Sequence, residues 1–355
     1  MFITDLFTAK SVAFVYTESA SNQIEYLGRA FFPTDKKMGL DLSWIKGHKG
    51  IPVTLKASSF DTVSTIRTRE GISKTETEMA YFKESMIIKE KDEQEVLRLV
   101  DANDPYARPV LQRIYDDANT LVEGAEVVPE RMIWQLLAPA TNGKPAISIA
   151  FDDATYDYDY DPNGEWVANN YVALTGTSAW TDTTNADPVA DIADLIETIK
   201  GITGTVIKYV VMNTATLAKV KANAKVKGMV LAQNVTANVI MNTARVKELF
   251  ESELGVSLVI YDKQFKNESG TALKFCPDGY VALLPDGALG KTWYGTTPAE
   301  RAKLADPTKN IELIDGRIAV QVTVSDDPVQ TKTTVSEIVL PSYERMDEVG
   351  VIKAF

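Results

Sequence analysis

The stretch VLQRIYDDANTLVEGAEVVPERMIWQLLA, residues 110–138, decides the fold of this chain. Its apolar residues recur every three or four positions, which is the spacing of one face of an α-helix. They are Leu111, Ile114, Tyr115, Ala118, Leu121, Val122, Ala125, Val128, Met132 and Leu136. As one helix, the stretch would span about 43 Å, which is long for a globular protein. It contains no chemical motif and predicts a structural spine.

Pro129 lies inside this pattern. A proline within a helix removes one backbone donor and clashes with the preceding turn. We therefore expect two helical segments that meet near Val128, in preference to one straight rod. The face opposite the apolar residues carries charged side chains, which are Arg113, Asp116, Asp117, Glu123, Glu126 and Glu130.

The overall composition is that of a soluble globular protein. The chain has 355 residues, of which 45% are hydrophobic and 24% charged, so two or three domains are expected. The net charge of −12 argues against a dedicated nucleic-acid binder, which needs a basic surface. We expect no transmembrane helix and no signal peptide. The single cysteine, Cys276, excludes an intrachain disulfide, suits a reducing cytoplasm and is expected to be a small core residue.

Two segments without enough apolar surface to fold alone precede the spine. Residues 1–45 predict an extended arm with one short helix, and residues 46–91 predict a long β-hairpin with its turn near Gly71. Residues 46–91 carry nine Lys/Arg and six Asp/Glu, whereas residues 101–200 carry five Lys/Arg and 18 Asp/Glu. The hairpin is therefore either a solvated loop or a basic arm that docks on the acidic body of a neighbouring copy, and charge alone leaves both open.

Helices and strands alternate after the spine. Asp187 and Pro188 are a good N-cap and first helical residue, and they predict a helix that reaches Lys200. Further helices are expected over 214–224, capped by Asn213, and over 242–254. Strands are expected over 206–212, 256–261 and 280–284, so residues 188–290 predict an α/β domain. The end of the chain predicts a β-hairpin of strands around 318–324 and 329–340 that packs on the spine helix.

Several short patterns look chemical, but each departs from its motif. Residues 285–292, PDGALGKT, follow a predicted strand as a phosphate loop does, yet Pro285 replaces the first glycine and no helix can begin after Thr292. Asp157, Asp159 and Asp161 have calcium-loop spacing, but proline and alanine replace the glycine and glutamate that such a loop needs. We expect a plain turn and a strand with tyrosines on one face.

The sequence offers no catalytic centre. His48 is the only histidine and Cys276 the only cysteine, so no clustered zinc site of these residues is available, and a histidine-dependent triad would have to use His48. Residues 297–300, TPAE, form a capping box that predicts a short helix and needs no functional interpretation. We predict no enzymatic activity, no cofactor and no metal site.

The order of these elements, together with several short motifs, resembles the lambda-type capsid protein E family of tailed phages. The motifs that carry the resemblance are Tyr26-Leu27-Gly28 with Phe31-Phe32-Pro33, Gly39-Leu40-Asp41, Glu130-Arg131-Met132, Gln135-Leu136-Leu137, Ser178-Ala179-Trp180, Asp187-Pro188, Pro277-Asp278-Gly279-Tyr280-Val281, Leu284-Pro285, Leu289-Gly290, Thr292, Tyr294-Gly295 and Thr297-Pro298. Each motif is short, but their order and spacing extend over nearly the full length.

The resemblance implies an α+β protein with the Hong Kong 97-type shell fold. It implies an N-terminal arm (1–45), an extended β-hairpin loop (46–91), a peripheral domain with the spine helix (92–187), an axial domain (188–290) and a return to the peripheral domain (291–355). It further implies a structural protein of the virion, assembled in the host cytoplasm, that forms the hexamers and pentamers of an icosahedral head.

Other components of such a head follow from the same resemblance. We expect a separate scaffold protein and a portal, and the resemblance also allows a decoration protein. The head is expected to enclose double-stranded DNA without specific binding. Arg67, Arg69, Lys74 and Lys83 on the extended loop are then candidates for contact with the acidic spine region of the adjacent subunit. Two alternatives stay open at this point: a nanocompartment shell of the same fold, and an α/β nucleotide-binding enzyme that uses residues 285–292.

Overall fold

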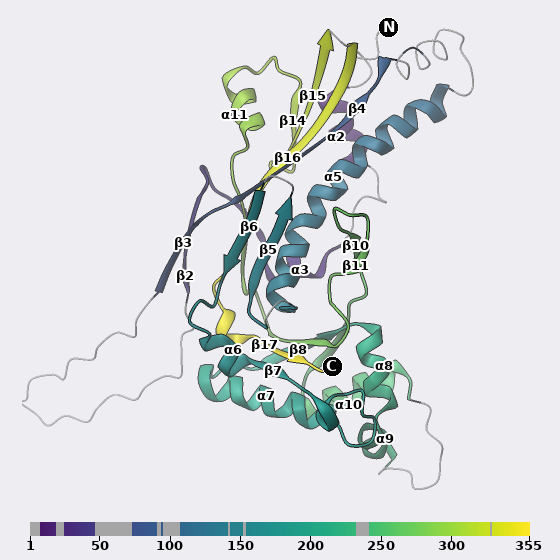
Figure 1. Cartoon of the computed structure of the whole chain (residues 1–355), viewed down its shortest axis with the longest axis vertical. Coiled ribbons are helices and arrows are strands. Elements are labelled where there is room, and N and C mark those ends of the chain that lie inside the picture. Colours follow the sequence, from purple (N-terminus) through teal and green to yellow (C-terminus); the bar gives the residue numbers. More distant parts are fainter. Residues whose placement is uncertain are drawn as a thin grey trace, which may run out of the picture. The chain divides into compact units, whose positions relative to one another are not determined.

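Two compact units make up the chain in the computed structural model (Figure 1). The model describes residues 8–18, 25–46, 73–90, 94, 107–140, 143–151, 154–231, 241–326 and 329–355. Unit 1 comprises Met1–Leu42, Glu76–Met132 and Lys291–Ser342. Unit 2 comprises Ser43–Thr75, Ile133–Gly290 and Tyr343–Phe355. The expected return segment 291–355 is thus divided between the two units.

The spine is one uninterrupted helix, α5 (Ala107–Leu137), with Pro129 inside it. The expected division near Val128 is therefore wrong. Pro129 is itself buried, and the residues after it are buried on most sides, including Met132 and Leu136. Burial of several large apolar side chains, at about 1.5–3 kcal/mol each, outweighs the cost of about 3 kcal/mol for an internal proline.

In the residues of unit 1 that the structure describes, three shorter helices accompany the spine. They are α2 (Ala9–Glu18), α3 (Leu27–Phe31) and α11 (Pro298–Ala305). The capping box before α11 is confirmed, since the Thr297 side chain accepts a hydrogen bond from the backbone N–H of Glu300.

A sheet of six strands forms the other half of unit 1 in the part of the chain that the structure describes. Its strands are β1 (Thr34–Lys36), β4 (Ala80–Ile88), β13 (Gly290–Tyr294), β14 (Ile311–Ile314), β15 (Ile318–Asp326) and β16 (Val329–Tyr343). The expected C-terminal hairpin is confirmed, because β15 pairs antiparallel with β16 from Asp326↔Val329 to Ala319↔Ser336. β1, the first of these strands along the chain, pairs in parallel with β13.

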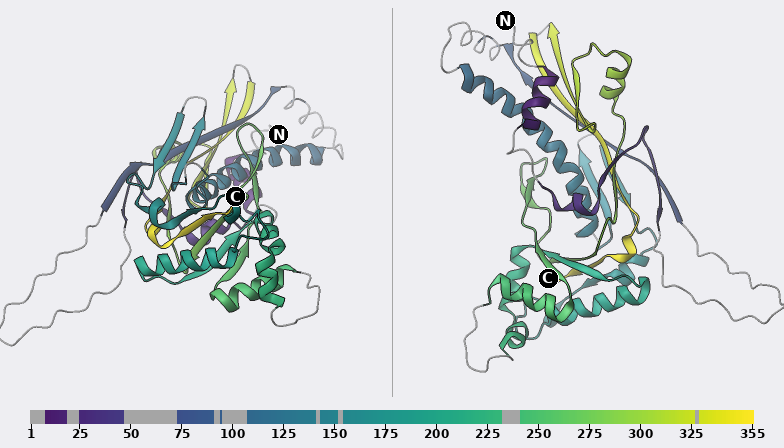
Figure 2. Two further views of the ribbon diagram at one scale, coloured as in Figure 1. Left: turned by 60° about the horizontal axis from the view of Figure 1, so that its bottom comes forward. Right: turned by 180° about the vertical axis from the view of Figure 1, so that it is seen from behind.

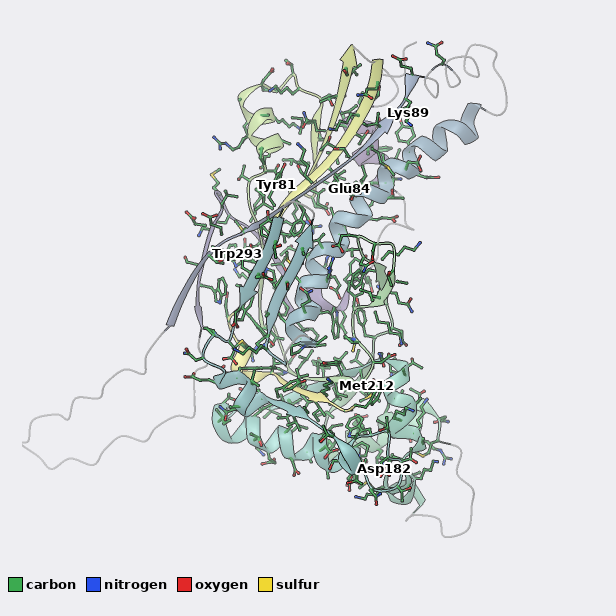
Figure 3. All side chains as sticks on the ribbon, in the orientation of Figure 1. Tyr81, Glu84, Lys89, Asp182, Met212 and Trp293 are labelled. Atoms are coloured by element: carbon green, nitrogen blue, oxygen red, sulfur yellow. The ribbon has the colours of Figure 1, made fainter. Side chains whose placement is uncertain are left out.

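Strand β4, which lies in the segment expected to return as the second strand of the extended hairpin, belongs to this sheet. β4 pairs antiparallel with β16 over nine residues, from Thr331↔Ile88 to Val339↔Ala80. Figure 3 shows Tyr81 and Glu84 along this strand. The expected opposing strand around 53–57 lies outside the described residues. Before β4, β3 (Ser73–Glu78) pairs with β2 (Asp41–Lys46) in a two-stranded ribbon.

The core of unit 1 lies between the spine helix and the C-terminal strands, as the sequence predicted. Leu121 and Val122 of α5 pack in one cluster with Ile318 and Val320 of β15. Helix α2 adds Val12 to the same cluster. The short helix of the N-terminal arm therefore has a place on the core of its own chain.

Unit 2 is built on a five-stranded mixed sheet in the described part of the chain. Its strands, in spatial order, are β7 (Tyr171–Ala173), β17 (Gly350–Lys353), β12 (Tyr280–Pro285), β8 (Ile207–Met212) and β9 (Ser257–Ile260). β8 and β9 are parallel, and β12 runs antiparallel to β8. The three strands expected around 206–212, 256–261 and 280–284 are thus found.

The described part of unit 2 has five helices, of which those at 188–203, 214–222 and 243–254 were expected within a few residues and the other two were not expected. The five helices are α6 (Glu165–Asn170), α7 (Pro188–Thr203), α8 (Thr214–Ala222), α9 (Ala224–Leu231) and α10 (Thr243–Leu254). Asp187, Asn213 and Asn242 each accept a hydrogen bond from a backbone N–H of the first turn of α7, α8 and α10. Gly204 and Gly255 end α7 and α10 with positive φ, which a glycine adopts without strain.

The remaining elements of unit 2 are small. They are the strand pairs β5 (Ala146–Phe151) with β6 (Ala154–Asp159) and β10 (Gln264–Lys266) with β11 (Ala272–Lys274), and the 3₁₀ turns η2 (Gly176–Ser178) and η3 (Met346–Glu348). The main core packs α7, α8 and α10 against the sheet through residues such as Ile192, Leu217, Phe250 and Leu283. None of the described helices is both long and apolar enough to cross a membrane.

Candidate functional site

The pattern that resembles a phosphate loop is a plain turn between strands. β12 ends at Pro285 and β13 begins at Gly290, so a strand follows the turn where a phosphate loop would have a helix. Lys291 pairs instead with Asp35, at 2.7 Å from Nζ to Oδ2. The nucleotide-binding alternative thus loses the helix N-terminus that its chemistry requires.

The aspartates with calcium-loop spacing are used in local hydrogen bonds. Asp157 accepts one from the Ser148 hydroxyl, Asp159 from the backbone of Asp161, and Asp161 from the backbone of Val167. Tyr156 and Tyr158 stack on one face of β6, with their ring planes 6° apart. Within the described ranges, no group of three or more His, Cys, Asp or Glu side chains has the arrangement of a metal site.

The remaining reactive side chains give no catalytic centre. Cys276 is buried as expected, and burial raises the pKa of its thiol to about 12. A thiol with so high a pKa is a poor nucleophile near neutral pH. His48 lies outside the described residues.

The predicted contact residues of the extended loop fall in different places. Arg67 and Arg69 lie outside the described residues, and Lys74 belongs to β3. Lys83 is exposed on β4, opposite Ser336 of β16. It is therefore part of the sheet surface of unit 1.

A buried network of charged side chains, which the sequence did not predict, lies in the interior of unit 1. Its centre is Glu126 of α5, which is only 6% exposed. One carboxylate oxygen pairs with Arg29 of α3, and the other lies 3.4 Å from Nη2 of Arg317, in the turn between β14 and β15. The same nitrogen of Arg317 lies 2.9 Å from Oδ2 of Asp315. The carboxylate of Glu126 thus joins the arm, the spine and the C-terminal sheet.

One turn further along the spine, Glu130 strengthens the same attachment. Its side chain is fully buried, and its Oε1 accepts a hydrogen bond of 3.0 Å from the backbone N–H of Gly28. This N–H belongs to the first turn of α3, where a helix has no backbone acceptor of its own. Glu126 and Glu130, which the sequence placed on the charged face of the spine, are therefore interior residues.

Aromatic rings complete the network. The Arg317 guanidinium lies over the ring of Tyr294, with 5.3 Å from Cζ to the ring centroid, and Arg29 lies over Tyr26 at the same distance. Such contacts between a cation and an aromatic face contribute about 0.5–2 kcal/mol each. Burial raises the pKa of Tyr294 to about 12, and the nearby carboxyl of Glu337 acts in the same direction.

Glu337 is a buried carboxyl group on β16 beside this network. Neither of its oxygens has a hydrogen-bond partner in the described part of the chain. Burial raises its pKa to about 8, although the positive charges of Arg317 and Arg29 act in the opposite direction. The group is therefore mostly protonated at neutral pH, which avoids the cost of an uncompensated charge in the interior.

A cavity of about 540 Å³ opens beside the network within unit 1. Its walls come from α2, the α3 region, the spine and the turn after β14, and include Tyr16, Glu25, Glu123 and Ile314. The cavity and the network contain no nucleophile next to a base and no metal-ligand cluster in the described residues. The arrangement fixes the N-terminal arm to the body of unit 1, which is a structural role.

Comparison with known proteins agrees with a structural role. The sequence matches the family model described as phage major capsid protein E over residues 14–350. A search among curated proteins gave no match.

Solved structures of phage-related proteins have the same fold. A phage-related protein of Bordetella bronchiseptica RB50 superposes with a TM-score of 0.56 at 14% identity, covering 98% of this chain and 97% of its own. A proposed prophage capsid protein of Escherichia coli CFT073 gives 0.56 at 14% identity, covering 98% and 99%. A chain of the cyanophage A-1(L) capsid gives 0.50 at 12% identity, covering 95% and 98%.

These similarities show the fold, and the family match shows the membership. The fold class expected from the sequence, an α+β Hong Kong 97-type capsid fold, is confirmed. The family is one of structural capsid proteins. The chain belongs to the phage major capsid protein E family, and its function is that of a major capsid protein.

Proposed function

We propose that this protein assembles with itself, as hexamers and pentamers, into the closed icosahedral head of a tailed phage or prophage. The observation that carries the proposal is the family match over residues 14–350. The fold that this chain shares with a cyanophage capsid chain over 95% of its length supports it. The head encloses double-stranded DNA, and the chain resides in the virion after assembly in the host cytoplasm.

Electron microscopy of the purified protein tests this proposal directly. We expect closed shells, sheets or tubes when the protein is concentrated alone or mixed with its scaffold protein. A protein that stays monomeric under both conditions would contradict the proposal. The DNA content of shells from infected or induced cells then tests enclosure of the genome.

The same role implies further partners. A separate scaffold protein would guide closure, and a portal would occupy one vertex. The proposal does not include a decoration protein. The net charge of −12 supports an inner wall that holds DNA without specific binding, since a like-charged surface does not retain the phosphate backbone.

We further propose that the extended loop of one subunit lies over the acidic spine of the next. The charge difference between residues 46–91 and 101–200 supports this contact. Because Glu126 and Glu130 are interior, the receiving carboxylates must come from exposed positions of the spine, such as Asp116 and Asp117. In the same scheme, unit 1 corresponds to the peripheral domain and the α/β part of unit 2 to the axial domain.

Charge reversal tests the loop contact. The double variant Arg67→Glu and Arg69→Glu should impair shell assembly but leave the monomer folded. A second reversal, Asp116→Lys and Asp117→Lys, should restore part of the yield. The matched control is Arg301→Glu with Lys309→Glu, which reverses two exposed cations elsewhere in unit 1. Normal shells from the Arg67 and Arg69 variant would refute the contact.

A further inference from the structure

The charges of unit 2 are separated along the chain. Residues 151–199 contain eleven Asp/Glu and no Lys/Arg. Residues 201–247 contain seven Lys/Arg and no Asp/Glu. Both segments belong to unit 2. An acidic protein of net charge −12 thus has a basic segment immediately after its most acidic one.

The fold places these charges at the two ends of helix α7. At its N-terminal end, Asp187 pairs with Lys225 of α9, at 3.4 Å between Oδ2 and Nζ. At its C-terminal end, Ile199 lies against Gly350, whose neighbour Val349 accepts a hydrogen bond from Asn170 of α6. Figures 1 and 2 show α6 at one end of α7 and α8, α9 and α10 gathered at the other.

We call the surface of α6 and of α7 from Asp194 to Thr203 the acidic end. Its exposed carboxylates are Glu165, Asp194 and Glu197. Lys200 is the one cation of these two helices, and it pairs with Glu197 at 3.1 Å. With Asp191, the two helices carry four carboxylates and one lysine.

We call the surface of α8, α9 and the first half of α10 the basic end. Its cations are Lys219, Lys221, Lys225, Lys227, Arg245 and Lys247. Lys219, Lys227, Arg245 and Lys247 have no ion-pair partner among the residues that the structure describes. Three glutamates follow Lys247 in α10, so the three helices carry six cations and three carboxylates in all. The acidic end, with three carboxylates and one lysine, and the basic end, with six cations, therefore have net charges of opposite sign.

Asp182 lies near the basic end but does not neutralise it. Figure 3 shows Asp182 at the α9 and α10 side of unit 2. Its carboxylate accepts hydrogen bonds from Asn185 and from the backbone N–H of Thr184. These bonds hold the pKa of Asp182 below its usual value, with the Asn185 side chain as the largest cause. They also direct the carboxylate toward its own loop.

A ring of identical chains requires one surface of each copy to meet a different surface of the next. Opposite charges at the two ends of a unit satisfy this requirement, and they also repel contacts between two like ends. We propose that the basic end of unit 2 docks on the acidic end of unit 2 in a second copy of this chain. This inference rests on the proposed self-assembly, and it names the surfaces that meet within a ring.

Reversal and exchange of the charges test the pairing. The variant Lys219→Glu with Lys227→Glu places like charges opposite each other, as does Asp194→Lys with Glu197→Lys. Each should lower the rate of shell assembly about tenfold at low ionic strength, because exposed charge pairs act mainly on encounter and orientation. The fourfold variant restores opposite charges in exchanged positions and should recover most of the wild-type rate.

The control keeps the charge change but moves it away from both ends. Lys208→Glu with Lys266→Glu reverses two exposed cations on β8 and β10 of the same unit. Assembly is followed by light scattering and electron microscopy, and circular dichroism confirms that each variant is folded. The wild-type rate should fall as salt rises from about 0.05 to 0.5 M, since the Debye length shortens to a few ångströms.

The outcomes separate this inference from the proposed function. Absence of shells from the wild-type protein contradicts the proposed function itself. Shells from the wild type together with normal assembly of both reversal variants overturn only the pairing of the two ends. Failure of the fourfold variant to recover, or an equal loss in the control, overturns it too. Normal shells of the Lys219 and Lys227 variant that hold less DNA would assign the basic end to nucleic acid instead.

Discussion

The two units bury different kinds of polar group. Unit 1 places Glu126, Glu130 and Glu337 in its interior, with Arg317 and Arg29 beside them. The buried polar groups of unit 2 are mainly neutral Asn and Thr side chains that cap helices, such as Asn213 and Asn223. Its charged residues lie mainly on the surface and are separated by sign. Charge therefore holds segments together inside unit 1, whereas in unit 2 it is available for contacts outside.

This difference follows from how each unit is connected. The sheet and core of unit 1 must attach an arm that lies about 100 residues before the spine residue it contacts, and a turn that lies almost 200 residues after it. Buried ion pairs are weak sources of net stability, but they penalise every arrangement that leaves a partner unpaired. The buried ion pairs of unit 1 thus determine the position of the arm, and they contribute less to the stability of the unit.

Removal of the central carboxylate should give the largest effect. Glu126→Ala leaves Arg29 and Arg317 without their shared partner and should lower the free energy of unfolding by about 3–5 kcal/mol. Glu197→Ala breaks the exposed pair with Lys200 in unit 2 and should cost less than about 1 kcal/mol. Urea denaturation of the monomer measures both. Similar small losses would mean that the network of unit 1 is no different from a surface ion pair.

Truncation of a core side chain in unit 2, which leaves a cavity, should lower the free energy of unfolding slightly less than Glu126→Ala does. This loss should not depend on salt. Leu283 of β12 is fully buried in the main core, and Leu283→Ala should cost about 2–5 kcal/mol. Leu304→Ala is the control, because this side chain is exposed on α11 and should change stability by about 0.5 kcal/mol or less. A strong salt dependence of the Leu283→Ala loss would show that the core of unit 2 is not mainly apolar in its energetics.

The free energy of unfolding should depend on pH because of Glu337, the buried carboxyl group of unit 1. Its pKa is about 8 in the folded protein and about 4.5 when unfolded, so its contribution to stability is full below pH 4.5 and is lost as pH rises through 8. Between these values the free energy of unfolding should fall by about 1.4 kcal/mol per pH unit from this group. Glu337→Gln should remove that slope.

The matched variant for this titration lies in unit 2. Glu197→Gln removes an exposed carboxyl group of unit 2 and leaves Glu337 in place, so the slope that Glu337 causes should persist. Thermal unfolding between about pH 4.5 and 8.5 measures all three proteins. A wild-type profile without the expected slope would show that Glu337 is ionised in the folded state.

The smallest effect should come from the cap of α7. Asp187→Ala removes the hydrogen bond to the N–H of Ala190 and the pair with Lys225, and it should cost about 1 kcal/mol. Asp187→Asn keeps a side-chain acceptor and should lose only a few tenths of that amount. Equal losses in the two variants would assign the stabilisation to the charge instead of the cap.

Features set by neighbouring residues could be predicted from the sequence. The start of α7 at Asp187-Pro188, its end at Gly204 and the alternation along β15 each depend on residues within a few positions. The family resemblance rested on the same short motifs. The burial of Glu126 could not be predicted in this way, because its partners Arg29 and Arg317 are brought to it only by the tertiary fold.

Two other differences have the same origin. Pro129 should end a helix by its local chemistry, but tertiary burial of the residues around it keeps α5 continuous. β4, in the segment expected to form the extended hairpin, pairs with β16, about 250 residues later, and this pairing was not expected. Periodicity predicts that a segment is a strand, but it does not identify the partner strand.

The position of β17 has a consequence for the timing of folding during synthesis. This strand lies between β7, which ends at Ala173, and β12, yet it begins only at Gly350. The sheet of unit 2 therefore cannot be completed until Lys353 has been synthesised, however early its other strands emerge from the ribosome. Helix α7 packs on this late strand through Ile199. A nascent chain thus lacks the completed sheet on which α7 packs until β17 has emerged.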